Sequence, residues 1–215
     1  MVGRDTALSC EIMHAGTRLQ RGLPLMTSII PRVTAAPRLH RAIVSTSDLL
    51  TRLRIESAFV GSVAHAAWLG EPIDEDAPLD VLVLMSSPQK NQLAMMASNR
   101  GFEVVREELE ATEELDLVPL MFCDQERNVR VHVLLATNAL YGRMVSSAVA
   151  AELAGGPQIR VVGAADLALL LTVGGDDRSI AVRDALLASG PAVIDRTAFN
   201  QRLVSLGLSD MVVSE

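Results

Sequence analysis

AFVGSVAHAAWLGEPIDEDAPLDVLVL, residues 58–84, is the stretch of sequence that decides the fold. A short apolar run ends at the Gly-Ser pair of 61–62, and helix-forming residues follow at once. Gly-Glu-Pro at 70–72 ends that helix, because Gly suits the left-handed position after a helix and Pro cannot continue one. An acidic loop at 74–76 then leads into the apolar run 79–84, which is typical of a strand. The stretch therefore predicts strand, turn, helix, loop and strand, in that order.

The residues on either side alternate between the hydrophobic spacings of helices and strands. Pro119 places its strand at a sheet edge or a bulge, because proline lacks the N–H that a strand ladder needs. Between 103 and 117, seven acidic residues accompany one Arg, which is typical of a solvated face or loop. We expect an α+β fold: a small mixed sheet flanked by helices, then a helical C-terminal part. The further helices are expected within 39–54, 88–100, 138–153, 164–173, 177–189 and 196–206, and the further strands at 102–105, 117–123, 129–135 and 158–162.

The composition is that of a globular protein with a substantial core. Of 215 residues, 49% are hydrophobic and 21% are charged. Gly and Pro are scattered through residues 1–37 without an apolar period, so we expect a loosely ordered arm there, a main domain over 38–162 and a helical subdomain over 163–215. The chain has two cysteines and no long uncharged apolar run, and its first residues lead into no apolar segment. We therefore expect a cytoplasmic protein with no secretory signal and no membrane partner.

The net charge of −7 is unevenly distributed along the chain. Residues 1–54 contain eight Arg and three acidic residues, a charge of +5, which leaves −12 for the rest. A basic arm on an acidic body can contact nucleic acid or an acidic partner. The arginines are scattered, however, and a single Lys90 in the whole chain indicates a coding bias toward Arg. Nucleic acid is therefore not the partner that we expect.

In order and spacing, residues 40–208 resemble the nucleotidyltransferase superfamily that includes DNA polymerase beta, and within it the minimal and abortive-infection toxin nucleotidyltransferases. The family pattern is Gly-Gly or Gly-Ser, a helix, then Asp-hydrophobic-Asp on the next strand and a third Asp on a later strand. Here Gly61 and Ser62 match the turn and Asp80 matches the first carboxylate. Leu82 stands at the second carboxylate position and His132 at the third. The resemblance thus implies a degenerate active site with one of three metal carboxylates.

Nucleotidyl transfer depends on a divalent metal that neutralises the triphosphate and activates the attacking hydroxyl. The resemblance implies Mg²⁺ at Asp80 and NTP as substrate or ligand, with phosphates bound by Gly61, Ser62 and the following helix N-terminus. A single carboxylate beside Leu82 should bind Mg²⁺ weakly. Candidate accessory residues are His132, His65, Asp74 and Asp76. Each residue also has a plainer interpretation: the Gly-Ser pair as a tight turn, Asp80 as a cap and the histidines as surface residues.

Three classes of function remain open. The first is a nucleotidyltransferase-like protein that is catalytically impaired and acts by binding a nucleotide or a protein partner, for instance an antitoxin, in a toxin–antitoxin-like or regulatory setting. The alternative is an active metal-dependent nucleotidyltransferase that transfers NMP from NTP to a protein, RNA or small molecule. The third is an unrelated globular protein in which the Gly-Ser pair and Asp80 match by chance. Loss of two carboxylates favours the first class, because the metal chemistry needs a cluster.

Overall fold

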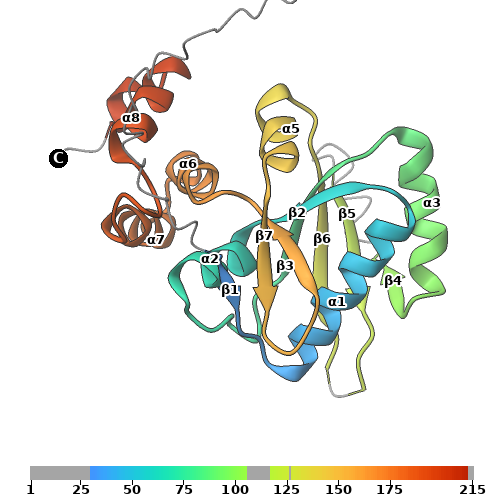
Figure 1. The fold of residues 1–215 in the computed structure, drawn as a ribbon. Coiled ribbons are helices and arrows are strands. Elements are labelled where there is room, and N and C mark those ends of the chain that lie inside the picture. Colours follow the sequence, from blue (N-terminus) through green and yellow to red (C-terminus); the bar gives the residue numbers. More distant parts are fainter. Residues whose placement is uncertain (1–29, 106–116, 126, 213–215) are drawn as a thin grey trace, which may run out of the picture.

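A mixed sheet of eight strands forms the middle of the molecule in the computed structural model, which describes residues 30–105, 117–125 and 127–212 (Figure 1). Its strand order is β1-β7-β8-β2-β3-β6-β5-β4. The centre consists of β2 (Glu56–Phe59), β3 (Leu79–Leu84) and β6 (Val129–Leu135). β3 is antiparallel to β2 and parallel to β6, so the two strands expected from residues 58–84 are adjacent in the sheet.

The other strands extend the sheet on both sides. β5 (Leu117–Phe122) is antiparallel to β6 and carries β4 (Phe102–Val104) as the edge strand. On the other side β8 (Gln158–Val161) pairs with β2, β7 (Val149–Leu153) pairs with β8, and β1 (Arg32–Val33) forms the second edge.

Helices flank the sheet, which confirms the predicted fold class (Figure 1). α1 (Pro37–Arg52) packs over β2 and β6 and against α3 (Ser87–Ser98). α2 (Gly61–Leu69) and α5 (Ala139–Ser146) both contact β3. Val131 and Val133 of β6 are fully buried, whereas His132 between them is half-buried, because successive side chains of a strand point to opposite faces.

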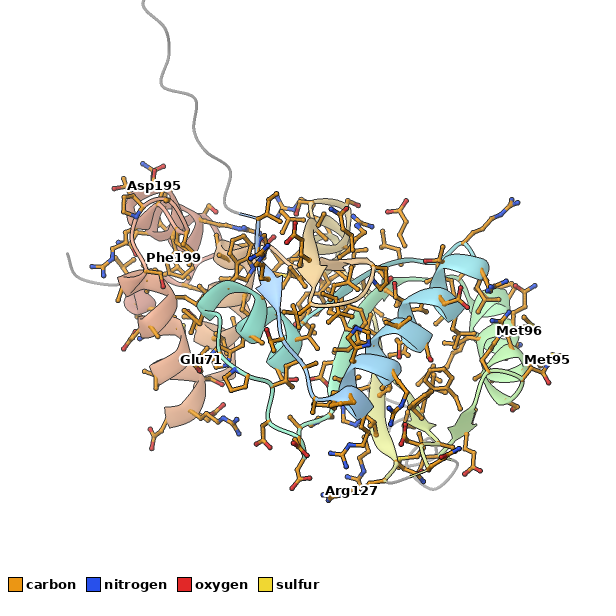
Figure 2. The ribbon with its side chains drawn as sticks, turned by 60° about the horizontal axis from the view of Figure 1, so that its bottom comes forward. Glu71, Met95, Met96, Arg127, Asp195 and Phe199 are labelled. Carbon is orange, nitrogen blue, oxygen red and sulfur yellow. The ribbon has the colours of Figure 1, made fainter. Side chains whose placement is uncertain are left out.

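The last described part of the chain is helical. α6 (Ala164–Gly174) contacts α2, and α7 (Asp177–Ala188) packs on α6. α8 (Arg196–Ser205) is capped by Asp195, which is labelled in Figure 2. The Asp195 carboxylate accepts hydrogen bonds from two backbone N–H groups of the first turn. The α8 side chain Arg202 forms an ion pair with buried Asp166 of α6, and a short 3-10 helix (Ser209–Met211) follows. Among the described residues, no helix is both long and apolar enough to cross a membrane.

The helix expected within 138–153 is shorter than predicted. α5 ends at Ser146, and the next residues form β7, which pairs antiparallel with β8. The β7 sequence Val-Ala-Ala-Glu-Leu, residues 149–153, has no strong strand pattern. Its pairing with β8 therefore outweighs the helix preference of Ala, Glu and Leu. The short strand β1 was also not expected. Its Val33 is fully buried, so residues 30–37 are attached to the sheet, while residues 1–29 of the expected arm lie outside the described residues.

The prediction that Pro119 marks an edge strand or a bulge is wrong. β5 lies between β4 and β6, and Pro119 pairs in register with His132. The Pro119 carbonyl accepts from the N–H of Val105, just beyond the end of β4. In an antiparallel ladder the backbone N and C=O of one residue face the same neighbouring strand. The nitrogen of Pro119, which carries no hydrogen, therefore faces the end of β4, where no strand residue needs its N–H. The acidic run of 103–117 falls mostly on 106–116, outside the described residues.

Candidate functional site

A pocket of about 300 Å³ lies where β2 ends, α2 begins and β3 starts. Residues of the stretch 58–84 line one wall, and residues of α6 and α7 line the other. The large aliphatic side chains in its lining are Ile73, Leu167, Leu171 and Val182. The polar and charged lining residues include Ser62, His65, Glu71, Asp74, Asp80 and Arg178.

Gly61 and Asp80 are in direct contact at the base of this pocket. Gly61 has a φ of +53°, and a Cβ atom placed on it would lie 2.6 Å from Oδ2 of Asp80. The backbone N–H of Val60 also donates to the Asp80 carbonyl at 2.9 Å. A tight turn between β2 and α2 therefore requires glycine here, both for the backbone conformation and for the close approach of the carboxylate.

His132 lies directly beside Asp80 on the neighbouring parallel strand. Its Nδ1 is 2.9 Å from Oδ1 of Asp80, and the two side chains are 26% and 27% exposed. Leu82, two residues after Asp80 on the same face, is buried at 4% exposure. The carboxylate thus has a histidine as its polar neighbour and a leucine as its apolar one.

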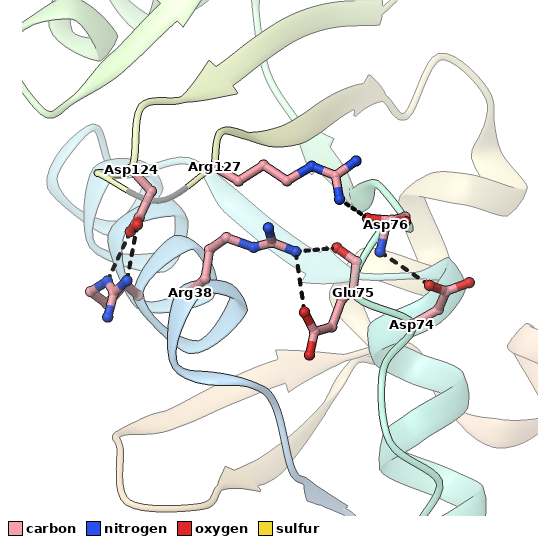
Figure 3. Close-up of polar contacts among 7 residues, drawn as sticks. Arg38, Asp74, Glu75, Asp76, Asp124 and Arg127 are labelled. Carbon is pink, nitrogen blue, oxygen red and sulfur yellow. Dashed lines mark hydrogen bonds and ion pairs between the residues drawn. The ribbon is translucent and has the colours of Figure 1, made fainter.

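The acidic loop before β3 is held by basic residues outside the pocket (Figure 3). Nη2 of Arg38 donates to the Glu75 carbonyl at 2.7 Å, and Arg127 forms an ion pair with Asp76. Oδ1 of Asp74 accepts from the backbone N–H of Asp76 at 3.0 Å. Asp74 lines the pocket, whereas Asp76 is directed to Arg127 and does not belong to the pocket lining.

Two further predicted residues lie on α2. The hydroxyl of Ser62 donates to the Pro78 carbonyl at 3.1 Å, so this side chain ties the turn to the start of β3. His65 Nε2 lies 3.4 Å from a carboxylate oxygen of Glu71. Glu71 follows α2 and lies between α2 and the C-terminal helices (Figure 2). The N-cap of α2 is Val60, which offers no side-chain acceptor to the first-turn N–H groups.

Sequence reasoning missed Arg178 and Ser179, which α7 brings to the pocket. Asp176 caps α7 by accepting from the backbone N–H of Ser179 at 2.9 Å. The hydroxyl and the N–H of Ser179 both donate to this carboxylate, and they hold the pKa of Asp176 below its ordinary value. The Asp cap marks a helix start in the sequence, but nothing in the neighbourhood of Arg178 shows that this helix faces residue 61.

The side chains around Asp80 do not match what Mg²⁺ requires. Mg²⁺ takes an octahedral set of oxygen ligands and is usually held by one or two carboxylates plus substrate phosphates. In the described residues, no three His, Cys, Asp or Glu side chains come together in a group that could hold a metal ion. One oxygen of Asp80 already pairs with His132, and the other packs against Gly61.

These observations define a mixed α/β protein with a pocket whose lining includes Asp80, and with His132 paired to that aspartate from outside the lining. No protein-family model matches the sequence, and no curated protein matches it. Among solved structures, the chain is similar to an antigenic nucleotidyltransferase-like protein from Paracoccidioides brasiliensis, at 12% sequence identity and a TM-score of 0.46. The match covers 85% of this chain and 94% of that chain.

Proposed function

We propose that this chain is a nucleotidyltransferase-like protein that binds a nucleotide in the pocket beside Gly61 and Ser62, and that its metal-dependent transfer is impaired. The observation that carries this proposal is the surroundings of Asp80. Its neighbour along the strand is buried Leu82, and its neighbour across the sheet is His132, 2.9 Å away. Neither adds the second carboxylate that a pair of catalytic metal ions would share.

Nucleotide binding is supported by what lines the two walls of the pocket. The N-terminus of α2, a helix of nine residues without a side-chain cap, presents backbone N–H groups of the kind that bind phosphate. Arg178 adds a guanidinium from the opposite wall. Leu167, Leu171 and Val182 supply apolar surface for the base or sugar. The volume of about 300 Å³ is at the lower end of the usual range for small-molecule pockets.

The carboxylates in the pocket oppose an anionic ligand, but each already has a partner. Asp80 pairs with His132, Glu71 lies beside His65, and Asp74 accepts from a backbone N–H. Hydrogen-bonded and paired carboxylates present less negative potential to a ligand than free ones do. We therefore expect a modest affinity that rests on Arg178 and the α2 N-terminus rather than on a metal.

The binding test compares Arg178→Gln with Arg183→Gln. Arg183 is on the same helix, pairs with Asp184 and does not line this pocket, so it is the matched control. Fluorescence anisotropy with labelled ATP, GTP, CTP and UTP is measured once with EDTA and once with Mg²⁺. The expected result is the same affinity in both buffers, and a loss of about tenfold or more for Arg178→Gln alone. Equal affinities of the two variants would contradict the proposal.

The transfer test incubates wild type and Asp80→Ala with labelled NTPs, Mg²⁺ or Mn²⁺, and cell extract. We expect labelling by wild type to stay near background, because one carboxylate holds the metal poorly. Strong labelling by wild type that disappears in Asp80→Ala would overturn the impaired-transfer half of the proposal. It would instead favour the active transferase, with Glu71 or Asp74 as the missing metal ligand, since both carboxylates line the same pocket.

A further inference from the structure

Arg54 has a backbone conformation that usually belongs to glycine. α1 ends in a Schellman motif: the N–H of Arg54 donates to the Thr51 carbonyl, and the N–H of Ile55 donates to the Leu50 carbonyl, both at 3.0 Å. Arg54 occupies the left-handed position of this motif with a φ of +54°. Among the described residues it is the one non-glycine with a positive φ, whereas seven glycines share that feature. Arg54 thus carries a side chain at a backbone conformation in which glycine would relieve the strain.

Arg54 lines a second pocket, of about 440 Å³, at the other end of β2 from Asp80. The C-terminal part of α1 forms one wall, and the first residues of β2 together with β8 form the other. Two arginines from different elements, Arg54 and Arg160, are among the residues that line this pocket. Three hydroxyl side chains accompany them, Ser47, Thr51 and Ser57, and one carboxylate, Glu56.

The charges nearby explain why Arg54 is available to a ligand. Arg52 and Arg100 both pair with Asp48, the acidic residue of α1, at 2.8 and 2.9 Å. Within the part of the chain that the structure describes, Arg54 forms no ion pair. Nη2 of Arg160 donates to the Val145 carbonyl at 2.8 Å, and among the described residues the other nitrogens of this guanidinium have no hydrogen-bond acceptor.

We propose that this second pocket binds a small phosphate-bearing anion and that Arg54 is retained, despite the strain, as its cationic ligand residue. Guanidinium groups recognise phosphate through paired charge-assisted hydrogen bonds, and hydroxyls complete the set of donors. Strain that persists at a charged, unpaired residue in a pocket is typical of functional positions. The C-terminal dipole of α1 and Glu56 oppose an anion, which favours a ligand that contacts both arginines at once.

A structural role for Arg54 and a ligand-binding role predict opposite effects of Arg54→Gly. If the arginine merely stabilises the C-terminus of α1 through the helix dipole, its removal lowers Tm. If it is retained for a ligand, glycine relieves the strain, and Tm in phosphate-free buffer rises by about 2–4 °C for a chain of this length. The ligand affinity falls in the same variant.

The test titrates wild type, Arg54→Gly and Arg178→Gln with inorganic phosphate, pyrophosphate and AMP at constant ionic strength, and follows amide chemical shifts by NMR. We expect saturable shifts at residues 51–57 in wild type and in Arg178→Gln, and a loss of affinity of about tenfold or more in Arg54→Gly. The phosphate and AMP arms distinguish a free phosphate from a nucleotide. Because Arg178 lines the first pocket, its variant separates failure here from failure of the proposed function.

Three outcomes overturn this proposal. In the first, wild type shows no saturable shift at residues 51–57 with any of the three anions. In the second, Arg54→Gly keeps the wild-type affinity, whatever its Tm. A lower Tm of Arg54→Gly would also contradict it, because the arginine would then be structural.

Discussion

Gly61 is the residue whose replacement tests the geometry at Asp80 most directly. A Cβ at residue 61 meets Oδ2 of Asp80 at 2.6 Å, whereas a Cβ at Gly70 meets nothing within 4 Å. Both glycines have a positive φ, +53° and +70°, so each alanine variant carries the backbone strain of about 1 kcal/mol. We expect Gly61→Ala to lose a further 1–3 kcal/mol, roughly, from overpacking. Urea unfolding of both variants measures the difference, and equal losses would contradict the close contact.

His132→Asp places a second carboxylate beside Asp80 without burying it deeply, since His132 is 26% exposed. In EDTA the two like charges should lower the free energy of unfolding by about 1 kcal/mol, which corresponds to about 2–4 °C in Tm. Mg²⁺ should restore that loss in the variant, because the metal now has two carboxylates. Thermal unfolding with and without Mg²⁺ is the measurement. Wild type is the control, and a wild-type Tm that rises equally with Mg²⁺ would show that its own site already holds the ion.

The candidate site could be predicted from sequence only where its residues follow one another along the chain. Gly61, Ser62, His65, Asp74 and Asp80 are all within twenty residues, and all of them line one pocket. His132 was identified through the family resemblance, as the residue at the third carboxylate position, and the parallel pairing places it beside Asp80. Arg178 was not found, because helix packing rather than sequence spacing brings it to the pocket.

At the scale of the element, the first turn of α7 forms part of one wall of the pocket beside Gly61, and Asp176 caps that turn. The Ser179 side-chain hydroxyl, first, and then backbone N–H groups keep the pKa of Asp176 below its ordinary value of 3.8. A lowered folded-state pKa means that this stabilisation is complete above the ordinary pKa and is lost as the pH falls through the lower, folded-state value. α7 should therefore keep its cap at neutral pH and lose it only in strong acid.

Asp176→Ala removes this cap at every pH. We expect faster hydrogen exchange at the amides of residues 177–180 and weaker nucleotide binding, because Arg178 is in the frayed turn. The control is Asp195→Ala, which removes the cap of α8, a helix that contributes nothing to the pocket lining. Exchange rates at residues 177–180 that stay at their wild-type values in Asp176→Ala would contradict the capping role.

Elements with strong local signals were predictable, and elements formed by long-range pairing were not. α3 begins after Ser86, a polar cap with proline in the first turn, and the side-chain oxygen of Gln89 accepts a hydrogen bond from the Ser86 N–H. β7 is made of Val-Ala-Ala-Glu-Leu, and only its neighbours β8 and β1 make it a strand. Two residues of β1 are too few for any periodic signal.

At the scale of the whole molecule, the N-terminal segment is attached through its last residues. The Pro31 carbonyl accepts from the N–H of Glu152, Val33 is fully buried, and Arg32 pairs with Glu152. We expect deletion of residues 1–29 to leave Tm unchanged. Deletion of residues 1–34 should lower it by several degrees, because burying a Val is worth about 1.5–3 kcal/mol. Calorimetry of the two truncated chains tests this, and a large loss with the shorter deletion would show that residues 1–29 stabilise the fold.

The pairing of β1 with β7 also has a consequence for biosynthesis. Arg32 and Glu152 are adjacent in the sheet but 120 residues apart in the chain. At a synthesis rate of about 5–20 residues per second, β1 leaves the ribosome roughly 6–24 s before its partner. Throughout that interval Val33 lacks its partner strand, and β1 is joined to the rest of the sheet only when β8 has followed β7 out of the ribosome.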